Sequence, residues 1–121
     1  MESSEQRAYD SREHDRVEVN LYVNKLVRGE PHVATARDLS VGGMFIANLL
    51  EPEASEGRGV VAIEFQLPNS YYVIWALGEV VRREGPDEKP GVAVRFLSIA
   101  QYDRELIARY VALLRELADP E

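Results

Sequence analysis

Hydrophobic and polar residues alternate along much of this chain, with the two-residue period of strands that bury one face. The clearest case begins at Val17, where every second residue is apolar as far as Val23. Similar stretches and short apolar runs predict further strands at about 32–39, 44–47, 61–67, 72–83 and 91–96. In the predicted strand at 72–83, one face is expected to carry Val73, Trp75, Leu77 and Val81.

Glycine- and proline-containing segments separate the predicted strands and read as turns or loops. They lie at about 28–31, 42–43, 51–59, 68–70 and 84–90. Several short strands without intervening helical patterns favour an antiparallel barrel or sandwich. Closure into a barrel would remove the exposed strand edges.

The C-terminal segment has a helical pattern instead. Ser98 followed by Gln101 resembles a capping box at a helix start, and Asp119-Pro120 ends the pattern. Between them, apolar residues recur at three- and four-residue steps: Ile99, Tyr102, Leu106, Tyr110, Leu113 and Leu117. This stripe either covers one mouth or face of the barrel or forms a dimer contact through a short helical zipper.

Composition and charge restrict the functions that the chain can have. Its 121 residues fit one domain, and 45% hydrophobic and 29% charged residues are typical of a soluble globular protein. Without cysteine there is no disulfide, thiolate zinc site or cysteine nucleophile. No apolar run could span a bilayer, and the N-terminus does not resemble a signal peptide, so we expect a cytoplasmic protein. The net charge of −7 argues against DNA and anionic membrane as partners.

One candidate binding segment is Asp38-Leu39-Ser40-Val41-Gly42-Gly43, with the pattern DxSxxG and an additional glycine. The Asp38 carboxylate can accept hydrogen bonds from the N1–H and N2–H₂ of guanine. The Ser40 hydroxyl can donate to a phosphate oxygen, and Gly42 and Gly43 let a bulky ligand approach the backbone. The alternative is a hairpin turn stabilised by Asp38 or Ser40 that binds nothing.

A second candidate segment carries Arg12 and Arg16 in the pattern RxxxR. A guanidinium can bind a phosphate or the O6/N7 edge of guanine with two hydrogen bonds, and it can stack on the purine. The alternative is surface pairing with Glu13 or Asp15. A strand, a turn and most of a second strand fill the interval between Arg16 and Asp38. A hairpin of this form brings its two ends together, so the two segments are expected to meet in space.

With both motifs in this order, the sequence resembles the PilZ domain family of bacterial receptors for cyclic di-GMP. Residues 91–96 and 43–46 are also similar to the family pattern, and the likeness covers roughly 12–97. The resemblance implies a six-stranded antiparallel barrel with a C-terminal helix. The expected division is a flexible N-terminal arm at 1–16, a barrel at 17–98 and a helix at 99–118.

The resemblance also implies a function and its residues. The ligand would be cyclic di-GMP, without cofactor, metal or catalytic residues, and the binding positions would be Ser11, Arg12, Arg16, Asp38, Ser40, Gly42 and Gly43. Ser11 replaces a basic or amide residue found in many binders, which favours one ligand molecule per site. Binding would order the arm and signal to an unidentified effector protein in motility, pilus or polysaccharide regulation.

Two other functions remain open on the sequence. The first is a PilZ-like adaptor that binds no nucleotide and acts by protein–protein contact. The second is an enzyme, which the residues disfavour because His14 and His32 stand in no recognisable metal or triad spacing. A metal site of Asp10, His14 and Asp15 can be drawn, but polar segments often contain such sets by chance.

Overall fold

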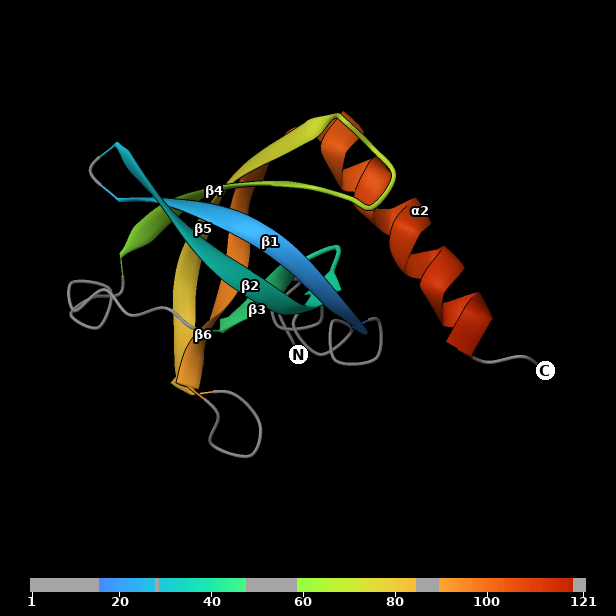
Figure 1. The fold of residues 1–121 in the computed structure, drawn as a ribbon, viewed down its shortest axis with the longest axis horizontal. Coiled ribbons are helices and arrows are strands. Elements are labelled where there is room, and N and C mark those ends of the chain that lie inside the picture. Colours follow the sequence, from blue (N-terminus) through green and yellow to red (C-terminus); the bar gives the residue numbers. More distant parts are fainter. Residues whose placement is uncertain (1–15, 28, 48–58, 85–89, 119–121) are drawn as a thin grey trace, which may run out of the picture.

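The computed structural model of the chain describes residues 16–27, 29–47, 59–84 and 90–118. These ranges contain six antiparallel strands followed by a helix (Figure 1). In chain order they are β1 Val17–Val27, β2 Glu30–Ser40, β3 Gly43–Ala47, β4 Val60–Gln66, β5 Val73–Glu84, β6 Pro90–Ile99 and α2 Gln101–Ala118. The fold class expected from the sequence is confirmed.

The strands form a closed barrel in the order β1-β2-β3-β6-β5-β4. Closure comes from β1, which pairs with β2 on one side and with β4 on the other. Consequently each strand hydrogen-bonds to two neighbours, and no long edge is left to pair with another chain. Strand alternation in the sequence did not decide between a barrel and a sandwich, and the structure is a closed barrel.

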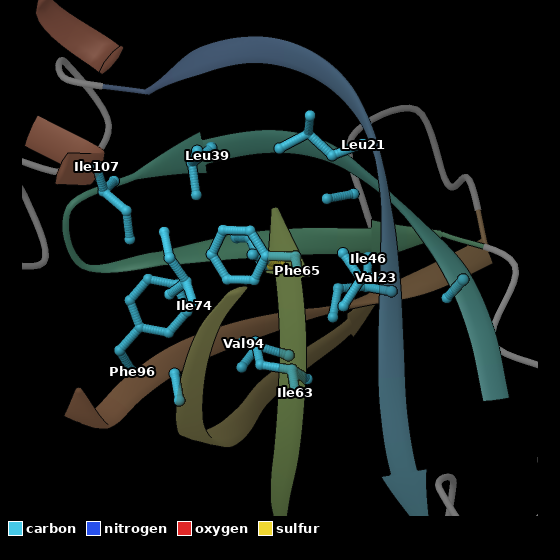
Figure 2. Packing of buried hydrophobic residues seen from close by; sticks show 14 of the residues in the cluster. Leu21, Val23, Leu39, Ile46, Ile63, Phe65, Ile74, Val94, Phe96 and Ile107 are labelled. Atoms are coloured by element: carbon cyan, nitrogen blue, oxygen red, sulfur yellow. The ribbon is translucent and has the colours of Figure 1, made fainter. Parts of the chain in front are cut away.

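The core fills the barrel with the inward side chains of alternating strand positions (Figure 2). In β1 these are Leu21 and Val23, as the alternation predicts, whereas Tyr22 between them is exposed. The largest fully buried apolar side chains are Leu39, Ile46, Ile63, Ile74, Ile107, Val23 and Val94. Burial of these side chains is the main stabilising contribution to the barrel.

Strand β5 turns its aromatic side chain outward. Val73, Trp75 and Val81 are exposed, and the residues between them point into the core: Ile74, Ala76 and Val80. Three of the four residues assigned to one face are therefore exposed, and the fourth, Leu77, is half-buried. Both faces of β5 are largely apolar, so alternation alone could not decide which one is buried.

Helix α2 packs against one end of the barrel (Figure 1). Ile107 and Val111 belong to the buried cluster, and Ile107 lies at the end of the core that also holds Leu39 and Phe96 (Figure 2). This agrees with the interpretation that the helix covers the barrel. The predicted stripe is only partly buried, because Leu113 and Leu117 are exposed.

The start of α2 differs from the sequence-based prediction. Ser98 is a β6 residue that pairs with Leu77, and the first helical hydrogen bond runs from the Arg104 N–H to the Ala100 carbonyl at 2.9 Å. Ala100 is therefore the N-cap position and the capping box at Ser98 is wrong. Strand pairing with β5 uses the backbone of Ser98 before the helix can begin. Within the described residues, no helix combines the length and apolar character needed to cross a membrane.

Candidate functional site

The two ends of the β1–β2 hairpin meet beside the first described residue, Arg16. Val17 pairs with Leu39 and Glu18 pairs with Asp38, so the start of β1 lies next to the end of β2. The Arg16 Nη1 donates a hydrogen bond to the Asp38 Oδ2 over 3.3 Å. The structure thus brings together one residue from each motif, as the hairpin argument predicts.

Asp38 also holds the strand that follows the turn. Its Oδ1 accepts a hydrogen bond from the Phe45 N–H at 3.1 Å, while Oδ2 faces Arg16. The pairing of β2 with β3 shifts register between Ala36 and Asp38, which marks a bulge at this point. The carboxylate therefore has a structural partner and a cationic partner at the same time. Its side chain is 18% exposed and that of Arg16 is 24% exposed, so solvent still reaches the pair.

Ser40 makes its hydrogen bonds inside the turn. It is 1% exposed, its Oγ accepts from the Gly42 N–H at 3.1 Å, and its hydroxyl donates to the Gly43 carbonyl at 3.4 Å. The sequence suggested that this hydroxyl donates to a phosphate. In the structure these hydrogen bonds fix the shape of the turn. The contact of the Ser40 hydroxyl with a phosphate stays a prediction.

Gly42 and Gly43 connect the turn to β6. The Phe96 N–H donates to the Gly42 carbonyl at 2.8 Å, and Gly43 pairs with Arg95. Backbone groups of three strands are therefore fixed around the turn. Gly42 is half-buried and Gly43 is buried, and neither adds a side chain at the turn.

Arg95 is a charged residue at this site whose role the sequence did not predict. It lies beside Gly43 on β6, and its Nη2 forms an ion pair with the Glu79 Oε1 on β5 at 2.5 Å. Only the strand order, which places β6 next to β3, brings it to the turn. An arginine at an outward position of the last strand was the signal in the sequence, but it does not indicate which strand lies alongside.

A groove separates this end of the barrel from the second half of α2. Its volume is about 1000 Å³, and it is lined by Arg16, Val17, Glu18, Ala112, Leu114, Arg115, Glu116, Leu117 and Ala118. Arg16 lines this groove and also forms the ion pair with Asp38. Space for a ligand therefore adjoins the motif residues, although the acidic side chain of Glu18 also lines the groove.

Several candidate residues fall outside the described part of the chain. Ser11 and Arg12 do so, as does the metal set drawn from Asp10, His14 and Asp15. Among the described residues, no group of three or more histidine, aspartate or glutamate side chains is arranged to hold a metal ion.

The described site thus combines two guanidinium groups, two carboxylates and a rigid glycine turn on one end of the barrel. Each arginine faces a carboxylate, Arg16 with Asp38 and Arg95 with Glu79. These pairs neutralise the charges locally and hold the guanidinium groups in place. A ligand with phosphate groups and hydrogen-bonding base edges could bind the solvent-exposed groups of both ion pairs in place of their present partners.

Solved structures that share this fold include the three that follow. Similarity to the Bacillus subtilis inhibitor of motility (MotI/DgrA) has a TM-score of 0.69 at 20% identity and covers 88% of this chain and 51% of that one. Similarity to the PilZ domain with c-di-GMP of YcgR from Escherichia coli has a TM-score of 0.65 at 18% identity and covers 85% of this chain and 90% of that one. Similarity to the Borreliella burgdorferi PlzA protein in complex with c-di-GMP has a TM-score of 0.61 at 12% identity and covers 94% of this chain and 56% of that one.

The chain thus spans about half the length of the first and third of these proteins. The comparison with curated proteins gave no match. The family model described as PilZ domain matches residues 10–113, which is most of the sequence. This match agrees with the barrel, the helix and the two motifs, and the chain therefore belongs to the PilZ domain family.

Proposed function

We propose that the chain is a receptor for cyclic di-GMP that acts by binding, without catalysis. The observation that carries this proposal is the contact between Arg16 of the RxxxR motif and Asp38 of the DxSxxG motif. It is supported by membership of the PilZ family and by the fold shared with two proteins whose structures contain c-di-GMP.

In the proposed complex, the ligand takes over groups that now bind each other. The Arg16 guanidinium contacts a phosphate or stacks on a guanine, and the Asp38 carboxylate accepts from the guanine edge. The Asp38–Phe45 hydrogen bond persists, because Oδ1 and Oδ2 serve different partners. Ser40 contributes by shaping the turn, and Gly42 and Gly43 place no side chain between the ligand and the backbone.

Ser11 and Arg12 complete the proposed site from the N-terminal side. We propose that one ligand molecule binds per site and orders residues 1–16 against the barrel, a disorder-to-order switch. Arg95 adds a guanidinium beside Gly43, and we propose that it contacts a second phosphate. The resulting surface would signal to an effector protein in motility, pilus or polysaccharide regulation.

A thermal-shift experiment tests the proposal on the whole chain. A ligand that binds the folded state stabilises it by about 2.7 kcal/mol at a concentration a hundred times its Kd. We expect cyclic di-GMP to raise the Tm by several degrees, cyclic di-AMP to raise it less, and Arg16→Ala to remove the effect.

Arg104→Ala is the matched control, since Arg104 is an exposed arginine on α2 that lines neither the turn nor the groove. This variant should respond to cyclic di-GMP as the unmodified chain does. An unchanged Tm of the unmodified chain with both nucleotides would reject the receptor and favour the adaptor that binds no nucleotide.

A further inference from the structure

The outward side chains of four neighbouring strands form a largely apolar surface in which one charged residue is embedded. Around the closed barrel, β2, β1, β4 and β5 are consecutive neighbours. Their pairing aligns one residue of each strand into a row of Val33, Asn24, Glu64 and Trp75. This row lies apart from the proposed nucleotide site, because Val33 is five residues, or about 17 Å, along β2 from Asp38.

An adjoining row across the same four strands consists of apolar residues only: Pro31, Leu26, Ala62 and Leu77. The two rows together are here called the Glu64 face. In this face Val33 is 67% exposed and Trp75 is 45% exposed, although both are large apolar side chains. A contiguous apolar surface of this kind on the outside of a barrel is typical of a site that binds another molecule.

Glu64 is the charged residue of the Glu64 face, whose other members are apolar except for Asn24. It is half-buried, and among the described residues no cationic side chain forms an ion pair with its carboxylate. Apolar neighbours lower the local dielectric and so strengthen the attraction of this carboxylate for a cation that a partner brings. The net charge of −7 adds a longer-range attraction for a basic partner.

Trp75 makes arginine the cation that fits best. It lies directly opposite Glu64 in the pairing of β4 with β5. Side chains opposed in this way have Cβ atoms about 4.5–5.5 Å apart. A guanidinium that reaches Glu64 can therefore form two hydrogen bonds with the carboxylate and place its plane on the Trp75 ring. A lysine ammonium has no planar group for either contact.

The surface is hollowed beside Glu64. A pocket of about 410 Å³ is lined by Glu64, Asn24 and Val33 of the Glu64 face and also by Tyr22 and Val73. Tyr22 is 79% exposed and Val73 is 50% exposed. A side chain that enters this hollow is thus contacted from several sides, which is the setting in which arginine and aromatic anchors contribute most to protein interfaces.

The same features disfavour other occupants of the Glu64 face. A second copy of the chain, docked about a twofold axis through this face, would bring the two Glu64 carboxylates towards each other. An added β-strand finds no edge to pair with, because the barrel is closed. Phosphate groups and anionic membranes are repelled by the carboxylate.

We propose that the Glu64 face docks a segment of another protein that presents an arginine flanked by apolar side chains. The arginine pairs with Glu64 and stacks on Trp75, while the apolar side chains cover Val33 and the apolar row. As a description of the effector protein, this inference rests on the proposed function, in which that protein is not identified. The docking itself does not require the nucleotide.

Selection from a phage-displayed library of random peptides on the full chain, without nucleotide, tests the proposal. Peptides enriched on the unmodified chain should carry an arginine among apolar residues. Fluorescence polarisation should show that Glu64→Gln and Trp75→Ala each weaken the binding of such a peptide about tenfold. Glu105→Gln is the matched control, because it makes the same change at an exposed residue of α2, and it should bind the peptide as the unmodified chain does.

Enrichment of peptides without arginine, absence of any enrichment, or unchanged peptide affinity of Glu64→Gln would overturn the proposal. A dimer of the unmodified chain that Trp75→Ala dissociates, measured by sedimentation equilibrium, would assign the face to a second copy and overturn it too. Thermal denaturation confirms that each variant is folded. Glu64→Gln should bind cyclic di-GMP as the unmodified chain does, so failure of the peptide test and failure of the receptor function are distinguishable.

Discussion

Asp38 is the residue whose substitution separates the structural role of the site from its proposed binding role. In Asp38→Ala, the Phe45 N–H loses the Oδ1 acceptor at 3.1 Å, and Arg16 loses the Oδ2 at 3.3 Å. An unsatisfied, partly buried donor costs about 1–3 kcal/mol, and a solvent-accessible ion pair contributes about 0–1 kcal/mol. Asp38→Ala should therefore lower the free energy of unfolding by about 1–3 kcal/mol.

Asp38→Asn is the matched variant, because its amide oxygen can still accept from the Phe45 N–H. It should lose only the charge facing Arg16, about 0–1 kcal/mol of the free energy of unfolding. Urea denaturation of both variants measures this difference. Equal destabilisation by the alanine and asparagine variants would refute the assignment of separate roles to Oδ1 and Oδ2.

Calorimetric titration of the same two proteins measures the binding role. If Asp38 accepts from guanine, the alanine variant loses a charged hydrogen bond of about 1.5–3 kcal/mol, which weakens the affinity for cyclic di-GMP at least tenfold. The asparagine variant retains a hydrogen-bond acceptor, so its affinity for cyclic di-GMP should lie between those of the unmodified chain and the alanine variant. Unchanged affinity of the folded alanine variant would show that Asp38 does not contact the ligand.

Three further predictions concern the fold around the site. Replacing Ile107 by alanine should lower the free energy of unfolding by about 2–5 kcal/mol, because this side chain is fully buried between α2 and the barrel; urea denaturation measures it. Gly91→Ala should destabilise the barrel by more than about 1 kcal/mol, since its φ is +152° and an added Cβ would lie 2.5 Å from a β3 carbonyl oxygen. Gly59→Ala, with nothing within 4 Å of the added atom, is the control and should be nearly neutral. The hydrogen bond to the buried Asp103 carboxylate raises the pKa of Tyr72 above 10.0. The stabilising contribution of this hydrogen bond is therefore complete below pH 10.0 and is lost as the pH rises through the folded-state pKa. Tyr72→Phe should show a shallower decrease in the free energy of unfolding at alkaline pH, and an identical decrease would contradict this prediction.

The strands and their turns could be predicted from the sequence because alternation and glycine placement act locally. The clearest example is β1, where Leu21 and Val23 are buried and Tyr22 between them is exposed. The face of β5 could not be predicted, because Trp75 and Ile74 are both apolar and only the closed barrel decides which one is inside. Ser98 was misassigned since its backbone is used by β5, a partner remote in sequence.

The site shows the same division between local and distant information. The contact between Arg16 and Asp38 follows from the length of one hairpin, and this part of the prediction is confirmed by the structure. The burial of the Ser40 hydroxyl depends on how the turn closes, and the position of Arg95 depends on β6 lying next to β3. Neither could be deduced from spacing along the chain.

Isothermal titration of the unmodified chain with cyclic di-GMP, beside cyclic di-AMP, tests most directly whether the arginine segment and the glycine turn form one binding site. Saturable binding of cyclic di-GMP with one molecule per chain, and much weaker binding of cyclic di-AMP, is the predicted result. Absence of binding heat for both nucleotides, at several temperatures, would contradict the receptor function.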